Sequence, residues 1–169
     1  MNMKSRVTTI VAGIILLITL SPVLAAEEQP VVISVKRMSM DMALTAGKTA
    51  IDACRKEGVQ IGVTIIDRGG NPQVVLRDVL AVDITLEISR LKAYTAMSFN
   101  TPTSDLGERL SAVNFNFDGI LANAGGLPIN VGGTLFGGIG VSGAPSGLTD
   151  EKCAQAGLDA IFDDLSMAD

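Results

Sequence analysis

The stretch AGGLPINVGGTLFGGIGVSGAPSG, residues 124–147, contains 9 of the 18 glycines of the chain. Apolar residues are interleaved with these glycines, whereas flexible linkers are polar, which argues against a linker. Two runs, Leu127–Val131 and Leu135–Val141, are typical of strands on either side of Gly132-Gly133. Because glycine weakens a strand, it marks a bulge, a bend or a place where another backbone or a ligand comes close. We therefore predict a glycine-rich hairpin that packs closely on a helix, a neighbouring subunit or a flat ligand.

A phosphate-binding loop is the main alternative for this stretch. A P-loop needs the pattern Gly-x-x-x-x-Gly-Lys-Ser/Thr, because its lysine reaches the phosphates, and residues 125–147 contain no lysine. The segment Gly138–Gly143 has the Gly-x-Gly-x-x-Gly spacing of dinucleotide-binding folds. That match lies inside an apolar strand, and nothing places an acidic ribose partner after a following strand. The sequence therefore argues against nucleotide chemistry.

Further elements are indicated by periodicity and turn signals. The run Ile61–Asp67, a turn at Arg68–Pro72 and the returning run Gln73–Arg77 predict a hairpin, which favours an antiparallel sheet. Helices are predicted at residues 40–57 after the cap Ser39, at 83–100, at 101–110, and from the cap Thr149 onward, while 113–124 indicate a loop with a helical turn. The predicted fold class is α+β, with an antiparallel β-sheet of about five strands flanked by helices.

The first 25 residues have the pattern of a secretory signal peptide. Lys4 and Arg6 precede the apolar run Ile10–Leu20, and Val23-Leu24-Ala25 is a small-residue cleavage pattern, with cleavage after Ala26 as an alternative. An uncleaved membrane anchor is disfavoured, because the apolar run is too short to span a bilayer comfortably. We expect residues 1–25 to be removed, 26–37 to form a mobile segment and 38–169 to form a single domain. The protein is then periplasmic or secreted, with no stable membrane insertion.

Charge and residue usage exclude several function classes. Loss of Lys4 and Arg6 with the leader takes the 13 basic residues to 11 against 18 acidic ones, a net charge of −7. An acidic surface of this kind argues against binding to nucleic acid or to anionic lipid. The chain has no histidine, which removes every Ser-His-Asp triad, the commonest general base and the commonest metal ligand.

Two cysteines, Cys54 and Cys153, fall on predicted helices near the two ends of the domain. In an oxidising compartment they can form a disulfide, and the alternative is two small buried thiols. Their spacing excludes a Cys-x-x-Cys redox or zinc motif. The sequence gives no distance between them, so both interpretations stay open.

Five ordered segments carry a family resemblance, and they are Val63–Gly70, Lys92–Ala96, Gly125–Ile129, Gly137–Gly143 and Thr149–Gly157. Together they resemble the GlcG/HbpS family of haem-binding proteins, which includes the C-terminal domain of PduO-type proteins. The match spans about residues 38–165. Two departures stand out: the chain reads Arg-Asp-Val-Leu-Ala at residues 77–81 where members often have Arg-Met-Asp-Gly-Ala, and it offers no histidine to ligate haem iron.

The resemblance implies a three-layer architecture similar to profilin or PAS domains, and assembly into homo-oligomers, possibly octamers. It also implies haem as the ligand, since members are associated with haem binding. Some members are associated with haem degradation, iron binding or signalling beside a sensor kinase. Other members are associated with pathways of glycolate, diol or alcohol oxidation.

Candidate ligand contacts follow from this resemblance and from side-chain chemistry. Lys92 and Arg77 are candidate partners of a propionate or other carboxylate, with a solvated or salt-bridged cation as the alternative. Tyr94 is a candidate iron ligand, although ordinary packing explains it as well. Thr101 is a candidate for a pocket rim or a helix end. The amides of Gly125-Gly126 suit an anion or a tight turn.

Metal candidates are weaker. Asp83 and Glu87 share a helical face at i,i+4 spacing, which suits a hard cation, yet a solvated acidic face is the simpler interpretation. Met38, Met40 and Met42 lie close together near the first helix and are better explained as core residues than as haem ligands.

The sequence therefore predicts an exported, oligomeric protein that binds a small ligand without turnover. Haem or a related tetrapyrrole is the first choice, for sequestration, delivery or sensing. One alternative is an accessory or sensor protein for a small carboxylate, or a partner in periplasmic alcohol or glycolate oxidation. Another is a haem-degrading enzyme, which the lack of histidine and of any clear nucleophile–base pair disfavours.

Overall fold

The computed structural model describes residues 30–113 and 117–168. The predicted signal peptide, residues 1–25, and the first part of the predicted mobile segment lie outside the described residues. A compact unit begins at Ser34, and the four described residues before it, 30–33, are exposed. Within the described part of the chain, no helix has the length and apolar character needed to cross a membrane.

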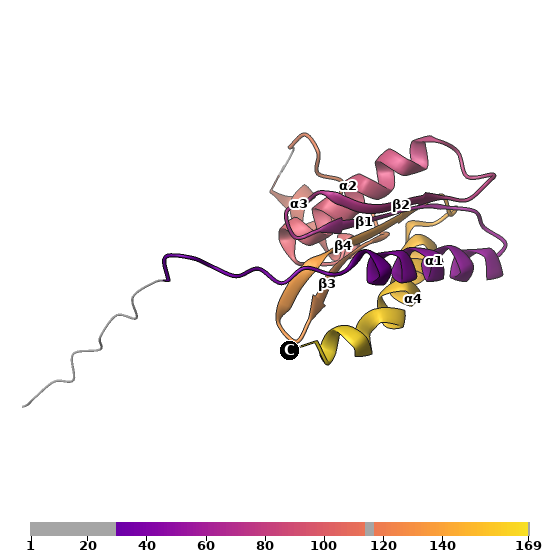
Figure 1. Cartoon of the computed structure of the whole chain (residues 1–169). Helices are drawn as coiled ribbons and strands as arrows, with labels where there is room; N and C mark the ends of the chain where they lie inside the picture. Colours follow the sequence, from indigo (N-terminus) through magenta and orange to yellow (C-terminus); the bar gives the residue numbers. More distant parts are fainter. Residues whose placement is uncertain (1–29, 114–116, 169) are drawn as a thin grey trace, which may run out of the picture. The chain divides into compact units, whose positions relative to one another are not determined.

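The described residues form four helices and four strands (Figure 1). In chain order they are α1 (Met40–Lys56), β1 (Gly62–Asp67), β2 (Pro72–Arg77), α2 (Ile84–Phe99), α3 (Thr103–Ala112), β3 (Gly126–Val131), β4 (Thr134–Ser142) and α4 (Gly147–Ser166). The sheet has the strand order β2-β1-β4-β3, and every neighbouring pair is antiparallel. The α+β class is confirmed, with four strands in the described residues in place of about five, and these are the four strands whose positions were predicted from the sequence.

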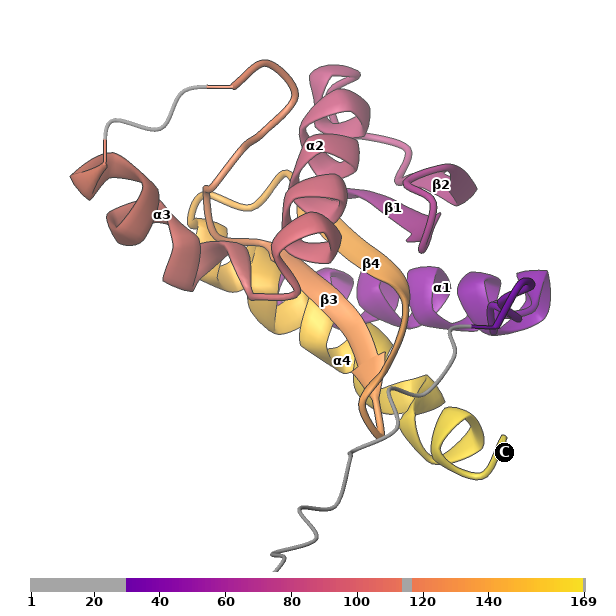
Figure 2. The same cartoon turned by 90° about the vertical axis from the view of Figure 1, so that its left-hand side faces the viewer.

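Three layers make up the domain, as Figure 2 shows: α1 and α4 cover one face of the sheet and α2 covers the other. The main core lies on the α1/α4 side. Alternate residues of β1 and β4, such as Val63, Ile65, Ile139 and Val141, meet small helical residues there. The side-chain period of two in a strand explains this alternation. A smaller cluster under α2 contains Ile66, Ala93 and Met97.

The predicted glycine-rich hairpin is β3–β4. Gly132 (φ 58°) and Gly133 (φ 83°) form its two-residue turn, where positive φ at both positions matches the right-handed twist of the flanking strands. Further along β4, a Cβ on Gly138 would lie 2.5 Å from the carbonyl oxygen of Ala93, and one on Gly140 would overlap the carbonyl oxygen of Ser89. Both carbonyls belong to α2. The neighbour that requires these glycines is therefore a helix of the same chain.

Replacing Gly140 by Ala is expected to lower the free energy of unfolding by about 2–3 kcal/mol, because the new methyl group overlaps backbone atoms that cannot turn aside. Gly47→Ala is the matched control. Its Cβ would lie 3.2 Å from the tip of Leu76 and in ordinary contact with Val74 and Val63, at 3.6 and 3.8 Å, so it would meet side chains and no backbone atom. Ala is also favoured inside α1. Urea unfolding followed by circular dichroism measures both variants. Equal stability of the Gly140 variant and the parent would contradict close packing of α2 on β4.

The final helix begins earlier than predicted. Ser146, not Thr149, is the N-cap of α4, and its hydroxyl accepts a hydrogen bond from the Leu148 amide at 3.3 Å. Thr149 is inside the first turn. The prediction was wrong because Ser and Thr are both good capping types, so residue type alone does not decide between the two positions.

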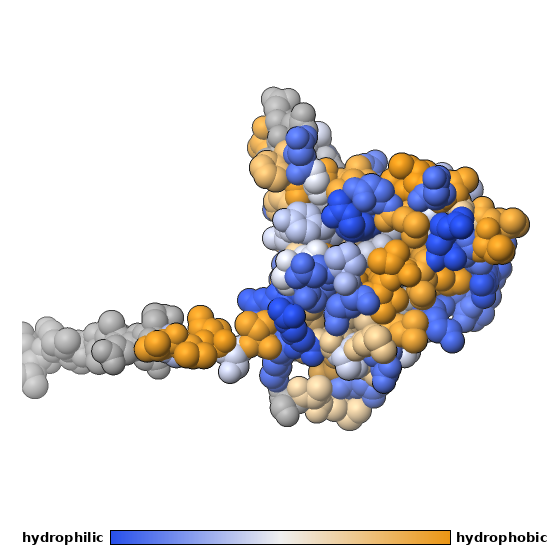
Figure 3. All heavy atoms as spheres, turned by 45° about the horizontal axis from the view of Figure 1, so that its top comes forward, coloured by the Kyte–Doolittle hydropathy of each residue, from blue (hydrophilic) through white to orange (hydrophobic). Residues whose placement is uncertain are grey.

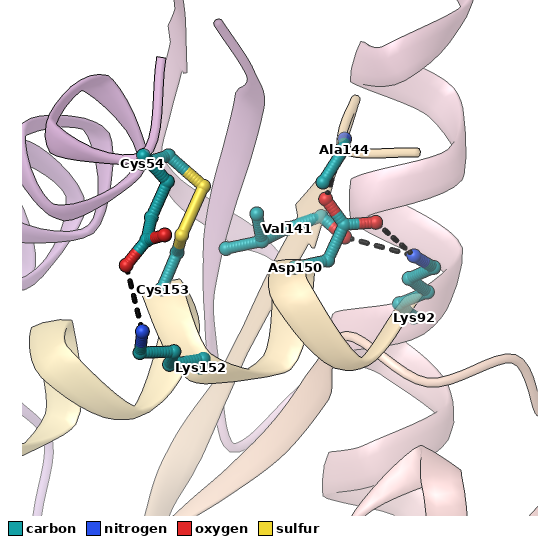
Figure 4. Close-up of a disulfide and its surroundings, with 8 residues drawn as sticks. Cys54, Lys92, Val141, Ala144, Asp150, Lys152 and Cys153 are labelled. Atoms are coloured by element: carbon teal, nitrogen blue, oxygen red, sulfur yellow. Dashed lines mark hydrogen bonds and ion pairs between the residues drawn. A yellow bond between two sulfur atoms is a disulfide. The ribbon is translucent and has the colours of Figure 1, made fainter. Parts of the chain in front are cut away.

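A disulfide joins the two helices of the α1/α4 layer. Cys54 of α1 and Cys153 of α4 are bonded, with 5.5 Å between their Cα atoms, and both residues are buried (Figure 4). Of the two possibilities that the sequence left open, the structure has the bridge. An ion pair between Lys152 and Glu57, 2.7 Å long, lies beside it on the surface.

Candidate ligand-binding site

A cleft of about 810 Å³ lies between the first half of α2, residues 121–124 and the start of α4. Its walls are largely apolar. The apolar lining residues with large side chains are Val82, Ile84, Ile88, Leu91, Leu121 and Leu148. The polar lining residues are Thr85, Lys92, Asn123, Ser142, Ser146 and Asp150. A cleft of this size, with mainly apolar walls that also carry polar groups, has the usual character of a small-molecule site.

The mouth of this cleft is unusually apolar. Val82, Ile84 and Leu148 are 62%, 56% and 66% exposed although they are large hydrophobic residues, and the adjacent Val79 and Leu80 are also exposed. Figure 3, which looks onto the α2 side, shows hydrophobic groups gathered toward one end of the domain. Several large apolar side chains exposed around one cleft mark a binding region for a ligand or a partner.

A buried ion pair forms the inner end of the cleft (Figure 4). The ammonium of Lys92 donates to Asp150 Oδ2 at 2.9 Å and to the carbonyl oxygen of Val141 at 3.0 Å. The other carboxylate oxygen of Asp150 accepts from the Ala144 amide at 2.9 Å. Both charged side chains are almost fully buried. The pair connects α2, the end of β4 and α4 around the cleft.

Burial has an electrostatic consequence for this pair. It raises the pKa of Asp150 above its ordinary value, and the hydrogen bonds from Ala144 and Lys92 oppose that rise only in part. The positive charge of Lys92 is matched by one carboxylate at hydrogen-bonding distance. The inner end of the cleft therefore offers a ligand no uncompensated charge.

The sequence singled out Lys92 but missed its partner Asp150, 58 residues away. One signal was present. Thr85, Ser89, Lys92 and Ala96 recur at helical spacing and form the buried face of α2, so a lysine in that row needs an internal partner. Which acidic residue supplies it depends on where the start of α4 lies in the tertiary structure.

The other predicted ligand contacts do not line the cleft. The ring of Tyr94 lies beside Gly70, where a Cβ would be 2.9 Å from it, and packs with Met97. The guanidinium of Arg77 donates to the carbonyl oxygen of Ala81. Thr101 donates to the carbonyl oxygen of Phe99 at 2.9 Å, in keeping with a helix end. These three side chains have local partners or packing outside the cleft.

Gly125 and Gly126 adjoin the cleft, and protein atoms already occupy their amides. The Gly125 amide donates to Glu151 at 3.1 Å, and the Gly126 amide donates to the hydroxyl of Thr103 at 2.8 Å. Gly125 also has φ 124°, and a Cβ there would lie 2.7 Å from the ammonium of Lys92. The glycine requirement comes from this close approach, and the amides have no free donor for an anion.

The predicted metal candidates are also engaged elsewhere. Asp83 accepts from the Ile84 amide at 2.9 Å, and Glu87 forms a 2.7 Å ion pair with Arg90, whose hydrogen bond lowers the pKa of Glu87. In residues 30–113 and 117–168, no three Asp, Glu or Cys side chains come together as metal ligands would. Met38 lies in the core, Met42 packs against it and Met40 is exposed.

Comparisons with known proteins agree with this architecture. Residues 38–159 match the family model described as haem degrading protein HbpS-like. A 15.0 kDa protein from the dhaT-dhaS intergenic region of Citrobacter freundii is 30% identical over 113 residues, which cover 60% of this chain and 80% of that protein.

Solved structures show the same fold. A double mutant of HbpS from Streptomyces reticuli is 35% identical with a TM-score of 0.75, over 81% of this chain and 95% of that one. The haem complex of PduOC is 25% identical with a TM-score of 0.68, over 75% of this chain and 96% of that one. The family match covers most of the chain and the structural likeness extends across the whole three-layer domain, so the protein belongs to the HbpS-like family.

Proposed function

We propose that the protein is an exported binding protein for haem or a related tetrapyrrole, which it holds in the cleft between α2 and α4. The observation that carries this proposal is a cleft of about 810 Å³ with apolar walls and an apolar mouth. The solved haem complex of a relative with the same fold supports the ligand class. Sequestration or delivery requires only that the ligand be bound and released.

The cleft residues fit one part of a haem and not the other. Apolar side chains such as Ile88, Leu91 and Leu148 suit the faces and edges of a porphyrin ring. No lining residue is a His, Cys, Met or Tyr, the usual axial ligands of haem iron. The only lining amine, on Lys92, is held by Asp150 and Val141. The cleft therefore fits the ring of a haem and lacks the usual side chains for its iron.

A small-carboxylate receptor is less well supported. Such a site needs a cation that is free to meet the ligand, and the cleft cation Lys92 already has a buried carboxylate at 2.9 Å. Displacing Asp150 would leave that carboxylate buried without its partner.

Export and self-association belong to the same proposal. The bonded pair Cys54–Cys153 suits an oxidising compartment, and export of the chain is what the predicted signal peptide implies. We therefore propose that the protein is periplasmic or secreted. The exposed apolar residues Val79 and Leu80 beside the cleft suit contact with a second copy. We propose a homo-oligomer on this basis.

Titration of the mature protein with hemin tests the function. We expect a saturable shift of the Soret band at one hemin per chain. Leu148→Asp places a charge at the cleft mouth and removes apolar contact, so binding should weaken about tenfold. Phe162→Asp is the matched control, because Phe162 is an exposed apolar residue of the same helix outside the cleft. Absence of a saturable shift, or an equal effect of both variants, would reject the cleft as the site.

A further inference from the structure

We propose that the cleft recognises the apolar ring of a tetrapyrrole and not its metal, so that a metal-free porphyrin binds as tightly as hemin. This inference rests on the proposed function and specifies its ligand class. It comes from a mismatch inside the site, where apolar surface is plentiful and iron ligands are missing.

None of the side chains that usually ligate haem iron lines the cleft in the described residues. The whole chain contains no histidine, so neither this copy nor an identical second copy can supply one. Both cysteines are used in the disulfide. The only tyrosine, Tyr94, lies against Gly70 and packs with Met97 outside the cleft. None of the methionines in the described residues lines the cleft.

The amine of Lys92, which does line the cleft, is held by hydrogen bonds to other groups of the protein. An ammonium that donates to Asp150 and to the Val141 carbonyl has no lone pair to offer a metal. To act as a ligand it would have to lose a proton and turn away, which would leave the carboxylate of Asp150 buried and unpaired. The ion pair therefore withholds the one cleft amine from iron.

The polar groups that remain are neutral. Within the described residues, the side chains of Asn123 and Ser142 form no hydrogen bond to the protein, so both are available to a ligand oxygen. Neither group distinguishes hemin from its metal-free form, since both molecules carry the same carboxylates. The difference between the two ligands lies at the ring centre, where the cleft presents no imidazole, thiolate, thioether or phenolate to the iron. We therefore expect the cleft to bind hemin and the metal-free porphyrin with equal affinity.

Parallel titrations with hemin and with protoporphyrin IX test the inference, the first followed by the Soret band and the second by porphyrin fluorescence. We expect dissociation constants within threefold of each other, both about tenfold weaker in Leu148→Asp and both unchanged in Phe162→Asp. Tyr94→Phe should leave both constants unchanged.

A hemin affinity more than thirtyfold above that of protoporphyrin IX would overturn the inference while leaving the proposed function intact. Loss of hemin binding in Tyr94→Phe with protoporphyrin binding retained would overturn it in the same way and identify the ligand. Failure of both porphyrins to bind would instead reject the proposed function and, with it, the inference.

Discussion

Replacing Lys92 by Met is expected to lower the free energy of unfolding by about 3–5 kcal/mol, the usual cost of removing one partner of a buried ion pair. Methionine keeps the length and apolar body of the side chain, so packing changes little. The carboxylate of Asp150 stays almost fully buried and keeps its hydrogen bond from the Ala144 amide, but it loses its cationic partner. The folded variant is therefore destabilised by a buried negative charge that no cation compensates.

Chemical unfolding with urea measures this loss, and the double variant Lys92→Met/Asp150→Asn is its control. Asparagine keeps an oxygen for the Ala144 amide and removes the charge, so the double variant should regain most of the stability. Additive losses in the two single variants and the double variant would show that the two side chains do not interact.

The pH dependence of the Lys92→Met variant separates lost charge pairing from lost packing. Burial already raises the pKa of Asp150, and removal of its cation raises it further. The folded variant then holds a proton that the unfolded chain releases, so the stability lost at about pH 7 should be recovered in part as the pH falls toward about 4. A deficit that is constant across this range would point to packing alone.

Removing the disulfide is the second large change. Cys54→Ala/Cys153→Ala is expected to lower the free energy of unfolding by about 2–5 kcal/mol, because the bridge closes a long loop in the unfolded chain across a sequence separation of 99 residues. Both cysteines are buried, and alanine leaves only a small space at each. The midpoint of guanidinium unfolding measures the loss.

Reductant provides the internal control for this prediction. The parent protein, unfolded in the presence of a phosphine reductant, should unfold at the same guanidinium concentration as the double alanine variant, and the variant should not respond to reductant. Hemin affinity of the folded variant should be unchanged, since neither cysteine lines the cleft. Coincident unfolding of the variant and the oxidised parent would mean that the bridge does not stabilise the fold.

Local chemistry made most of the fold predictable. The positive φ of Gly132 and Gly133, the β-branched apolar run of β1 and the helical spacing in α2 all depend on residues a few positions apart, so the hairpin and three of the helices could be predicted from the sequence. The predicted start of α4 was wrong by three residues, because two good capping residues, Ser146 and Thr149, lie three positions apart and the local pattern does not choose between them.

The candidate site was predictable only in part. Lys92 and Tyr94 lie in one motif, but two residues along a helix turn the side chain by about 200°, so only one of them can face the cleft. The sheet and α4 decide which one it is. Arg77 and Thr101 were predicted from the chemistry of their side chains, and in the structure both donate to nearby carbonyl oxygens outside the cleft.

The sequence by itself determined the antiparallel hairpins, the glycine requirement of β4 and the absence of any histidine for catalysis or metal binding. Only the tertiary structure decided that α2 is the neighbour of those glycines, that Cys54 is bonded to Cys153, and that Lys92 is neutralised by Asp150. The physical reason is the range of the interactions. Turn and strand preferences act over a few residues, whereas pairings across 58 or 99 residues exist only once the helices have packed on the sheet.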